Sequence, residues 1–119
     1  MDRIEQTYSV LTVSAADKFS ASLHTLLPEG QYDPVRAVRD AASARRLLLE
    51  QSFDIVIVNA PLPDEFGTQL ALELSETSGA GVLLLVKAEQ YAELSARLTP
   101  NGILTLQKPT TPQLLTQTL

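Results

Sequence analysis

The clearest strand in the sequence is Phe53-Asp54-Ile55-Val56-Ile57-Val58, and a loop rich in turn residues, Asn59-Ala60-Pro61-Leu62-Pro63-Asp64-Glu65-Phe66-Gly67, follows it. Apolar residues occupy consecutive positions from Ile55 to Val58, which is typical of a strand that is covered on both faces. A second run of this kind, Val82–Val86, lies further along the chain. Two such strands favour a parallel sheet with helices packed on both of its faces.

Strand and helix patterns alternate on either side of this segment. The remaining strands are predicted at Tyr8–Val13, Tyr32–Val38 and Ile103–Gln107. Helices are predicted at Lys18–Leu27, from a cap at Asp40 along the stripe Ala41, Ala44, Leu47 and Leu48, at Thr68–Ser78, at Glu89–Leu98, and from about Thr111 to the end of the chain. Pro34 places the second strand at or near an edge of the sheet. Five β-α units in a row predict an α/β fold with parallel strands and right-handed crossovers.

Composition limits what the chain can do. It has 119 residues, 45% of them apolar, which is enough for one domain with a packed core. Its net charge of -5 disfavours nucleic-acid binding by this segment itself. Cysteine is absent and His24 is the single histidine, which excludes disulfides, thiol catalysis and multi-histidine metal sites. No signal peptide or membrane-length apolar run is visible, so we expect a soluble cytoplasmic domain that does not contact a membrane.

The two ends of the chain differ from the repeating pattern. Residues 1–7 are predicted to be an N-terminal extension, and residues 8–119 form the domain. The final helix is still running at Leu119, with no residue that would cap it. We expect that the last helix continues toward a further domain, although a short natural final helix is the alternative.

Ligands of doubly wound sheets bind beyond the carboxyl ends of the strands. With Leu62-Pro63 and Gly67 after the third strand and Lys108-Pro109 after the fifth, the sequence resembles the receiver domains of two-component response regulators over Tyr8 to Leu119. The resemblance implies a flavodoxin-like, CheY-like (βα)5 fold with strand order 2-1-3-4-5. It also implies an acidic pair and an aspartate that hold Mg²⁺, with that aspartate accepting a phosphoryl group in phosphorelay signal transduction.

This sequence departs from the receiver pattern at almost every functional position. The acidic pair falls on Ser14 and Ala15, the phosphoacceptor on Asn59, and the hydroxyl residue on Val86. The family's aromatic switch residue falls near Thr105, and the lysine, Lys108, is retained.

These replacements remove the chemistry of the aspartyl switch. Mg²⁺ requires charged oxygen ligands, whereas Ser14 and Asn59 offer neutral oxygens and Ala15 offers none. An amide is also a poor nucleophile, because its nitrogen lone pair is delocalised and its oxygen carries no full charge. The sequence therefore predicts a pseudo-receiver that is not an enzyme and that holds no metal or cofactor.

Two local questions remain open at this stage. Asp17, Asp64 and Glu65 are acids near the predicted site, and we expect Asp17 to cap a helix and the other two to lie in a solvated loop rather than to hold a cation. Lys108 either donates to the Asn59 amide oxygen or is solvated at the rim of the sheet. We further expect His24 to be a structural residue and the pair Arg45-Arg46 to lie on a solvated helix face.

A closer resemblance rests on longer strings. The segments 54–67, 81–87 and 106–110 are similar to the degenerate receivers of Firmicutes ANTAR-type antitermination regulators. This resemblance implies a dimer that controls a C-terminal RNA-binding domain beyond Leu119, and thereby transcription. Receivers of the family commonly associate with a second copy or another protein through the face of helix 4, strand 5 and helix 5. Candidate residues on that face are Lys87, Tyr91, Leu94, Thr105, Gln107, Leu114, Leu115 and Thr118. Leu94, Leu115 and Tyr91 have a plainer interpretation, as core or scattered surface residues.

Two other functions compete with the pseudo-receiver. In a conditional phosphoreceiver, Asp64 or a deamidated Asn59 would take the phosphoryl group. In a flavin or small-molecule binder, a phosphate-cradling loop would follow the first strand, but Ser14-Ala15-Ala16-Asp17 contains no glycine and carries an acid. Phosphorylation of an Asn59→Asp variant would favour the former, and a yellow colour of the purified protein the latter.

Overall fold

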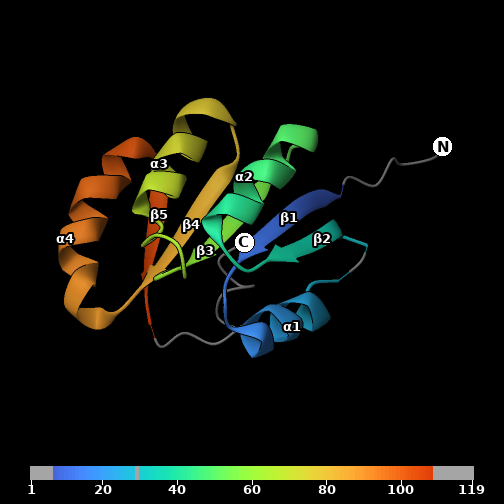
Figure 1. Cartoon of the computed structure of the whole chain (residues 1–119), viewed down its shortest axis with the longest axis horizontal. Coiled ribbons are helices and arrows are strands. Elements are labelled where there is room, and N and C mark those ends of the chain that lie inside the picture. The colour runs from blue at the N-terminus through green and yellow to red at the C-terminus, as the bar shows by residue number, and fades with distance from the viewer. Residues whose placement is uncertain (1–6, 29, 109–119) are drawn as a thin grey trace.

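The computed structural model of the protein describes residues 7–28 and 30–108. Five parallel strands form one sheet in the order β2-β1-β3-β4-β5, and Figure 1 shows the helices packed on its two faces. The strands are β1 (Tyr8–Val13), β2 (Tyr32–Val38), β3 (Ile55–Asn59), β4 (Gly81–Val86) and β5 (Ile103–Gln107). The helices are α1 (Asp17–Leu26), α2 (Ala41–Glu50), α3 (Thr68–Thr77), α4 (Ala88–Leu98) and the short 3₁₀ turn η1 (Thr99–Asn101). This is the flavodoxin-like, CheY-like fold that the sequence predicted, with β2 at one edge.

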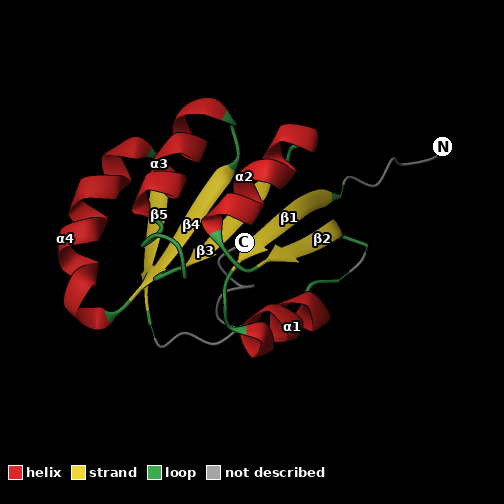
Figure 2. Ribbon diagram, in the orientation of Figure 1, coloured by secondary structure: helices red, strands yellow, loops and turns green. Residues whose placement is uncertain are grey.

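The apolar run in β3 supplies both faces of the core, because successive side chains of a strand point to opposite sides. Val56 and Val58 belong to the cluster beneath α2, α3 and α4, whereas Ile57 belongs to the cluster beneath α1. All three side chains are fully buried. Figure 2 shows the corresponding layers, with α1 on one side of the sheet and α2 and α3 on the other.

The helices begin and end within a residue or two of the predicted bounds. Asp40 caps α2 as expected, because its carboxylate accepts a hydrogen bond from Ser43 N at 2.8 Å. The buried stripe of α3 consists of Leu70, Ala71 and Leu74. The predicted helix from about Thr111 lies outside the described residues, and so does most of the predicted N-terminal extension.

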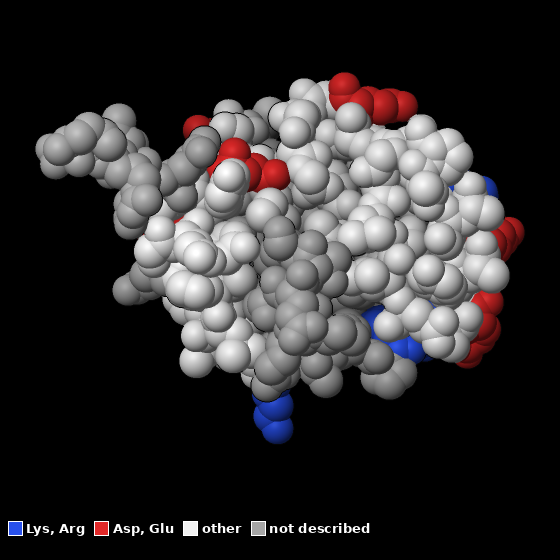
Figure 3. All heavy atoms as spheres, turned by 180° about the vertical axis from the view of Figure 1, so that it is seen from behind, with Lys and Arg blue, Asp and Glu red and all other residues white. Residues whose placement is uncertain are grey.

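None of the helices in the described part of the chain is long and apolar enough to cross a membrane. The face seen from behind carries its described charged side chains mainly toward its margins (Figure 3).

Candidate functional site

Parallel strands bring their carboxyl ends to one rim of the sheet, and the five predicted site residues gather there. Ser14 directly follows β1, Asn59 ends β3, Val86 ends β4, and Lys108 directly follows β5. Ser14 and Val86 are buried, whereas Ala15, Asn59 and Lys108 keep part of their surface in solvent. Three of the five are joined by side-chain hydrogen bonds.

Asn59 is the centre of this network. Its Nδ2 donates to Ser14 Oγ at 3.0 Å, and its Oδ1 accepts from Lys108 Nζ at 3.0 Å. Ser14 Oγ also accepts from Ala16 N at 3.0 Å, which fixes the hydroxyl at the start of α1. The two ends of the amide are thereby assigned by their partners, since an ammonium requires an acceptor. Of the two alternatives for Lys108, the structure has the contact with Asn59.

Lys108 is a half-buried cation whose partners are both neutral. Besides Asn59 Oδ1, its Nζ donates to the carbonyl oxygen of Ala60. Burial lowers the pKa of Lys108, and the nearby charge of Lys87 lowers it further. The positive charge therefore sits at the rim with hydrogen bonds but without an anionic partner among the described residues.

The residues at this rim do not fit Mg²⁺, the ion that the receiver fold implies. Ser14 and Asn59 supply only neutral side-chain oxygens, and Asn59 Oδ1 already accepts from the Lys108 ammonium. A divalent cation at that oxygen would therefore face a positive charge at short range, with no carboxylate to offset it. Within residues 7–28 and 30–108, no group of three or more acidic, histidine or cysteine side chains is placed to hold a metal ion.

Asp17 does not cap a helix, contrary to the sequence-based expectation. The N-cap position of α1 is Ala16, and Asp17 is the first helical residue. Its carboxylate forms an ion pair with Arg39, which follows β2. The partner lies 22 residues away in the chain, so the local sequence pattern could not indicate it.

Asp64 and Glu65 lie in the loop after β3, as expected, and Asp64 is exposed, but the carboxylates of both residues bind helices. Asp64 Oδ1 accepts from Ala41 N at 3.0 Å and Oδ2 accepts from Ala42 N at 2.9 Å, so the carboxylate binds the amino end of α2. These two backbone hydrogen bonds lower the pKa of Asp64. Glu65 accepts from Leu70 N at 3.2 Å, at the start of α3. The loop after Asn59 is thus attached to two helices.

Arg45 does not lie on a solvated helix face either. Its guanidinium pairs with Glu65 at 2.8 Å and with Glu73 at 2.9 Å, and all three side chains are partly buried. Hydrogen bonds to Glu65 and then Glu73 raise the pKa of Arg45, and the bond from Arg45 lowers that of Glu73. Nothing in the local sequence signalled this cluster, because its members are 20 and 28 residues apart. Arg46, in contrast, is exposed as expected.

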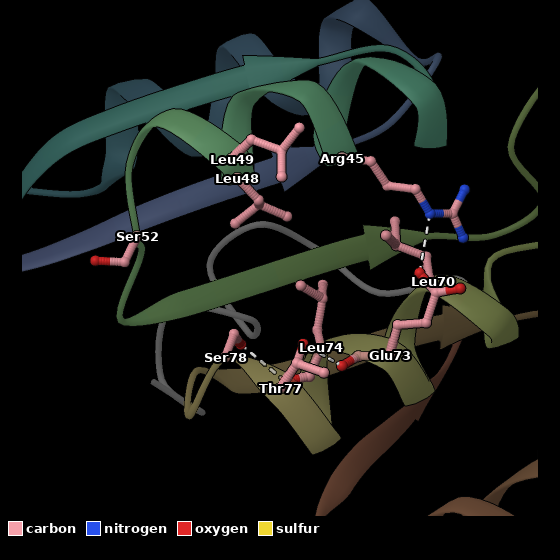
Figure 4. A pocket seen from close by; sticks show the side chains of 9 residues that line it. All are labelled: Arg45, Leu48, Leu49, Ser52, Leu70, Glu73, Leu74, Thr77 and Ser78. Carbon is pink, nitrogen blue, oxygen red and sulfur yellow. Dashed lines mark hydrogen bonds and ion pairs between the residues drawn. The ribbon is translucent and has the colours of Figure 1, made fainter.

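A pocket of about 510 Å³ opens between α2 and α3 beside this cluster. Figure 4 shows Leu48 and Leu49 on one wall, Leu70 and Leu74 on the other, and the Arg45–Glu73 ion pair at one end. The ion pair and the Asp64 bonds both join α2 to the segment that follows β3. The pocket therefore lies between α2 and α3, next to the contacts that join α2 to this segment.

Some residues of the predicted association face are buried in the core, and others are exposed to solvent. Leu94 and Thr105 are buried, at 6% and 2% relative exposure, and belong to the interior. Lys87 and Gln107 are exposed and Tyr91 is half-buried against the core. Leu114, Leu115 and Thr118 lie outside the described residues. His24 is exposed on α1.

No protein-family model matches the chain, and no curated protein matches it either. Solved structures do. The signal receiver domain of an HD domain-containing protein from Pseudomonas fluorescens Pf-5 is 25% identical, with a TM-score of 0.79 and coverage of 99% of this chain and 88% of that chain. The signal receiver domain of a putative Luxo repressor protein from Vibrio parahaemolyticus is 17% identical, with a TM-score of 0.83 and coverage of 95% and 87%.

The chemotaxis response regulator CheY4 of Vibrio cholerae is 23% identical, with a TM-score of 0.77 and coverage of 95% of this chain and 96% of that chain. The chain is thus similar to these receivers over nearly its whole length and nearly theirs. The structural neighbours of this protein are response regulator receiver domains, and it has their fold.

Proposed function

We propose that this chain is the regulatory receiver module of a two-component-type response regulator, and that it signals by associating with protein rather than by accepting a phosphoryl group. The observation that carries the proposal is the hydrogen bond from Lys108 Nζ to Asn59 Oδ1 at 3.0 Å. An amide stands where a receiver has its acceptor carboxylate, and the lysine of the receiver pattern is already bound to it. No acidic pair stands at Ser14 and Ala15 to hold the metal.

The output of this module is proposed to be a C-terminal RNA-binding domain of the ANTAR type, which acts in transcription antitermination in the cytoplasm. The support is the similarity of segments 54–67, 81–87 and 106–110 to degenerate receivers of that class. The acidic charge of the chain agrees with this division of labour, because RNA would be bound by the other domain.

The associating partner is proposed to be a second copy of the chain or another protein domain. Within the described residues, Lys87, Tyr91 and Gln107 offer accessible surface along α4 and β5. Leu94 and Thr105 are excluded from this surface by their burial.

The test is phosphorylation by a small phosphodonor. The chain is incubated with acetyl phosphate and Mg²⁺, and its intact mass is measured. We expect no mass increase. A triple variant, Ser14→Asp with Ala15→Asp and Asn59→Asp, restores the receiver's carboxylates and serves as the matched control. A stoichiometric acyl phosphate on the unaltered chain would overturn the proposal.

The conditional phosphoreceiver is less well supported. Asp64 would have to release Ala41 N and Ala42 N before its carboxylate could attack phosphorus. Phosphorylation of Asp64 would disturb its bonds to these two amides at the start of α2, where Asp40 holds only Ser43 N. Peptide mapping of any phosphorylated product distinguishes Asp64 from Asn59.

A further inference from the structure

The pocket between α2 and α3 has no part in the proposed function. Its volume of about 510 Å³ lies within the range of small-molecule sites in proteins. It lies on the face of the sheet opposite α1, and none of its lining residues belongs to the rim at the carboxyl ends of the strands. A ligand in this pocket would not contact the residues at which a receiver is phosphorylated.

Leucines form the walls of the pocket. Leu48 and Leu49 project from α2, and Leu70 and Leu74 project from α3 (Figure 4). Leu70 and Leu74 are buried, whereas the side chain of Leu49 is 87% exposed at the edge of the pocket. A ligand with an apolar body that covers Leu49 would remove this apolar surface from water, and that removal favours binding.

The hydroxyl groups of two lining residues offer acceptors to a ligand, because their hydrogens are already used. Thr77 Oγ1 donates to Glu73 O at 2.6 Å, and Ser78 Oγ donates to Leu74 O at 2.8 Å. Each hydroxyl oxygen has two lone pairs, and at least one of them remains available. A ligand that donates hydrogen bonds therefore matches these groups better than a ligand that only accepts them.

The end of the pocket at Arg45 carries a net negative charge. Arg45 pairs with both Glu73 and Glu65, so two carboxylates face one guanidinium. Arg45 Nε donates to Glu73 Oε1 at 2.9 Å, and Oε2 accepts from the neutral amide of Gln69 at 3.2 Å. The hydrogen bond from Arg45 lowers the pKa of Glu73, whose side chain is 43% exposed. Glu73 is therefore an accessible carboxylate that is ionised at neutral pH.

The chain segment around the pocket is acidic as well. Residues 40–86, which run from the cap of α2 to the end of β4, contain seven acids, two arginines and no lysine, a formal charge of -5 that equals that of the whole chain. Arg45 is paired with two carboxylates, and Arg46 has Glu50 one turn further along α2. This surface would repel an anion or a second copy of itself, whereas it would attract a cation.

We propose that the pocket between α2 and α3 binds a small organic cation, namely a primary amine with an apolar body of the size of a hexyl chain or a phenyl ring. The ammonium group pairs with Glu73, and the apolar body packs against the leucines of both helices. A primary ammonium fits better than a quaternary one, because it donates hydrogen bonds to the carboxylate. The inference goes beyond the proposed function and does not rest on it.

The experiment is a titration of the ¹⁵N-labelled chain with hexylammonium chloride at neutral pH and constant ionic strength. The reporters are the backbone amides of Leu49 and Thr77 and the side-chain Nε–H of Arg45. Hexan-1-ol and hexanoate, which carry the same hydrocarbon chain, are titrated for comparison. We expect saturable shifts with the amine, about fivefold weaker binding of the alcohol, and no saturable binding of hexanoate. Equal binding of the amine and the alcohol, or no saturable shifts with the amine, would overturn the inference.

Variants locate the ammonium group. Glu73→Gln is expected to abolish the preference for the amine over the alcohol. Glu76→Gln is the matched control, because it removes an exposed carboxylate from the same helix outside the pocket, and it should retain the preference. Equal preferences in the two variants would contradict the assignment of Glu73. If Glu73→Gln does not fold, the comparison of the three compounds on the unaltered chain still decides the question.

A second pair of variants locates the apolar body. Leu49→Ala is expected to weaken the binding of both the amine and the alcohol about threefold, because it removes part of the apolar wall. Leu26→Ala is the matched control, since Leu26 is a partly exposed leucine of α1, on the other face of the sheet. Unchanged binding by Leu49→Ala would contradict the assigned wall.

A second copy of the chain is the other occupant that the experiment must distinguish. Spectra of the chain without amine are recorded over a range of protein concentrations, and we expect no change at Leu49 and Thr77. Shifts at these amides that depend on protein concentration would place a second copy at the pocket and overturn the inference. The acetyl phosphate experiment has no bearing on this outcome, because it tests the rim and not the pocket.

Discussion

Asn59 Nδ2 lies 3.0 Å from Ser14 Oγ and donates a hydrogen bond to it, which joins residues 45 positions apart at the ends of β3 and β1. Both positions carry acids in a phosphorylatable receiver, where they would repel each other without a cation between them. Here a neutral donor and a neutral acceptor meet directly. The contact joins the carboxyl ends of two strands that are already paired along their backbones.

Replacing Asn59 with Asp tests whether one carboxylate at the rim is enough for phosphorylation. Asn59→Asp gives Lys108 an anionic partner but places a carboxylate beside Ser14 Oγ and removes the Nδ2 donor. We expect no phosphorylation of this single variant by acetyl phosphate and Mg²⁺, because Ser14 and Ala15 still supply no anionic ligand. Intact mass is the measurement. A phosphorylated single variant would mean that one carboxylate suffices at this rim.

Gly67 is predicted to be the glycine least tolerant of substitution. It precedes α3 with φ at +125°, and a Cβ there would lie 3.0 Å from Val58 Cγ1, within the core. Gly67→Ala therefore combines backbone strain with a steric clash in the segment that follows Asn59. We expect the free energy of unfolding, measured by urea titration, to fall by about 2–4 kcal/mol.

Alanine substitutions at two other glycines distinguish backbone strain from steric clash. Gly79 has φ at +72° but open space where the methyl group of an alanine would lie, so Gly79→Ala should cost about 1 kcal/mol from strain alone. Gly30 has neither a positive φ nor a neighbour within 4 Å, so Gly30→Ala should change stability by less than about 0.5 kcal/mol. Equal costs at all three positions would contradict the steric argument for Gly67.

The fold could be predicted because its signals are local. The apolar run through Val58 marks a strand that is buried on both faces, and Pro34 marks an edge strand, as the sheet order confirms. Asp40 lies three residues from the amide that it caps. Such patterns depend on periodicity and on neighbours in the chain, which a sequence displays directly.

The contacts that the sequence did not indicate are those of polar side chains whose partners are distant in the sequence. Asp64 binds amides 23 and 22 residues away, and Arg45 pairs with Glu65 and Glu73 across the seam between α2 and α3. Charged residues of these types are equally compatible with a solvated surface. Only the tertiary structure therefore shows which partners they bind. The contact between Asn59 and Lys108 was one of two predicted alternatives because the resemblance to receivers placed both at the same rim.

A substitution at Thr105 is predicted to raise the stability of the protein, not to lower it. Its hydroxyl is buried and has no hydrogen-bond partner among the described residues. Thr105→Val replaces the hydroxyl with a methyl group of similar volume and removes an unsatisfied polar atom. We expect stability to rise by about 1 kcal/mol, measured as a higher urea midpoint with an unchanged slope. A loss of stability would show that the hydroxyl is satisfied in solution.

Arg45 is predicted to hold the seam between α2 and α3. Arg45→Gln removes both ion pairs and leaves two carboxylates facing each other, so we expect stability to fall by about 1 kcal/mol at neutral pH, since all three side chains are partly solvated. Arg46→Gln is the matched control, because Arg46 is exposed and donates only a 3.2 Å bond to Ser43 Oγ among the described contacts. Equal losses in the two variants would contradict a special role for Arg45.

The same network makes stability depend on acid pH. The pKa of Glu73 is lowered first by the hydrogen bond from Arg45, and that of Asp64 by the amides of Ala41 and Ala42. A carboxylate whose folded pKa lies below its unfolded value stabilises the fold above the unfolded pKa, near 4, and loses this contribution as pH falls through the folded pKa. Urea midpoints measured from pH 6 down to pH 2 should therefore decline in the unaltered chain.

Asp64→Asn should decline less steeply over that range, because its side chain no longer takes up a proton on acidification. Glu76→Gln removes one exposed carboxylate from α3 without touching the network, and it is the matched control. If the acid dependence of Asp64→Asn equalled that of Glu76→Gln and of the unaltered chain, the two amide bonds of Asp64 would contribute nothing in solution.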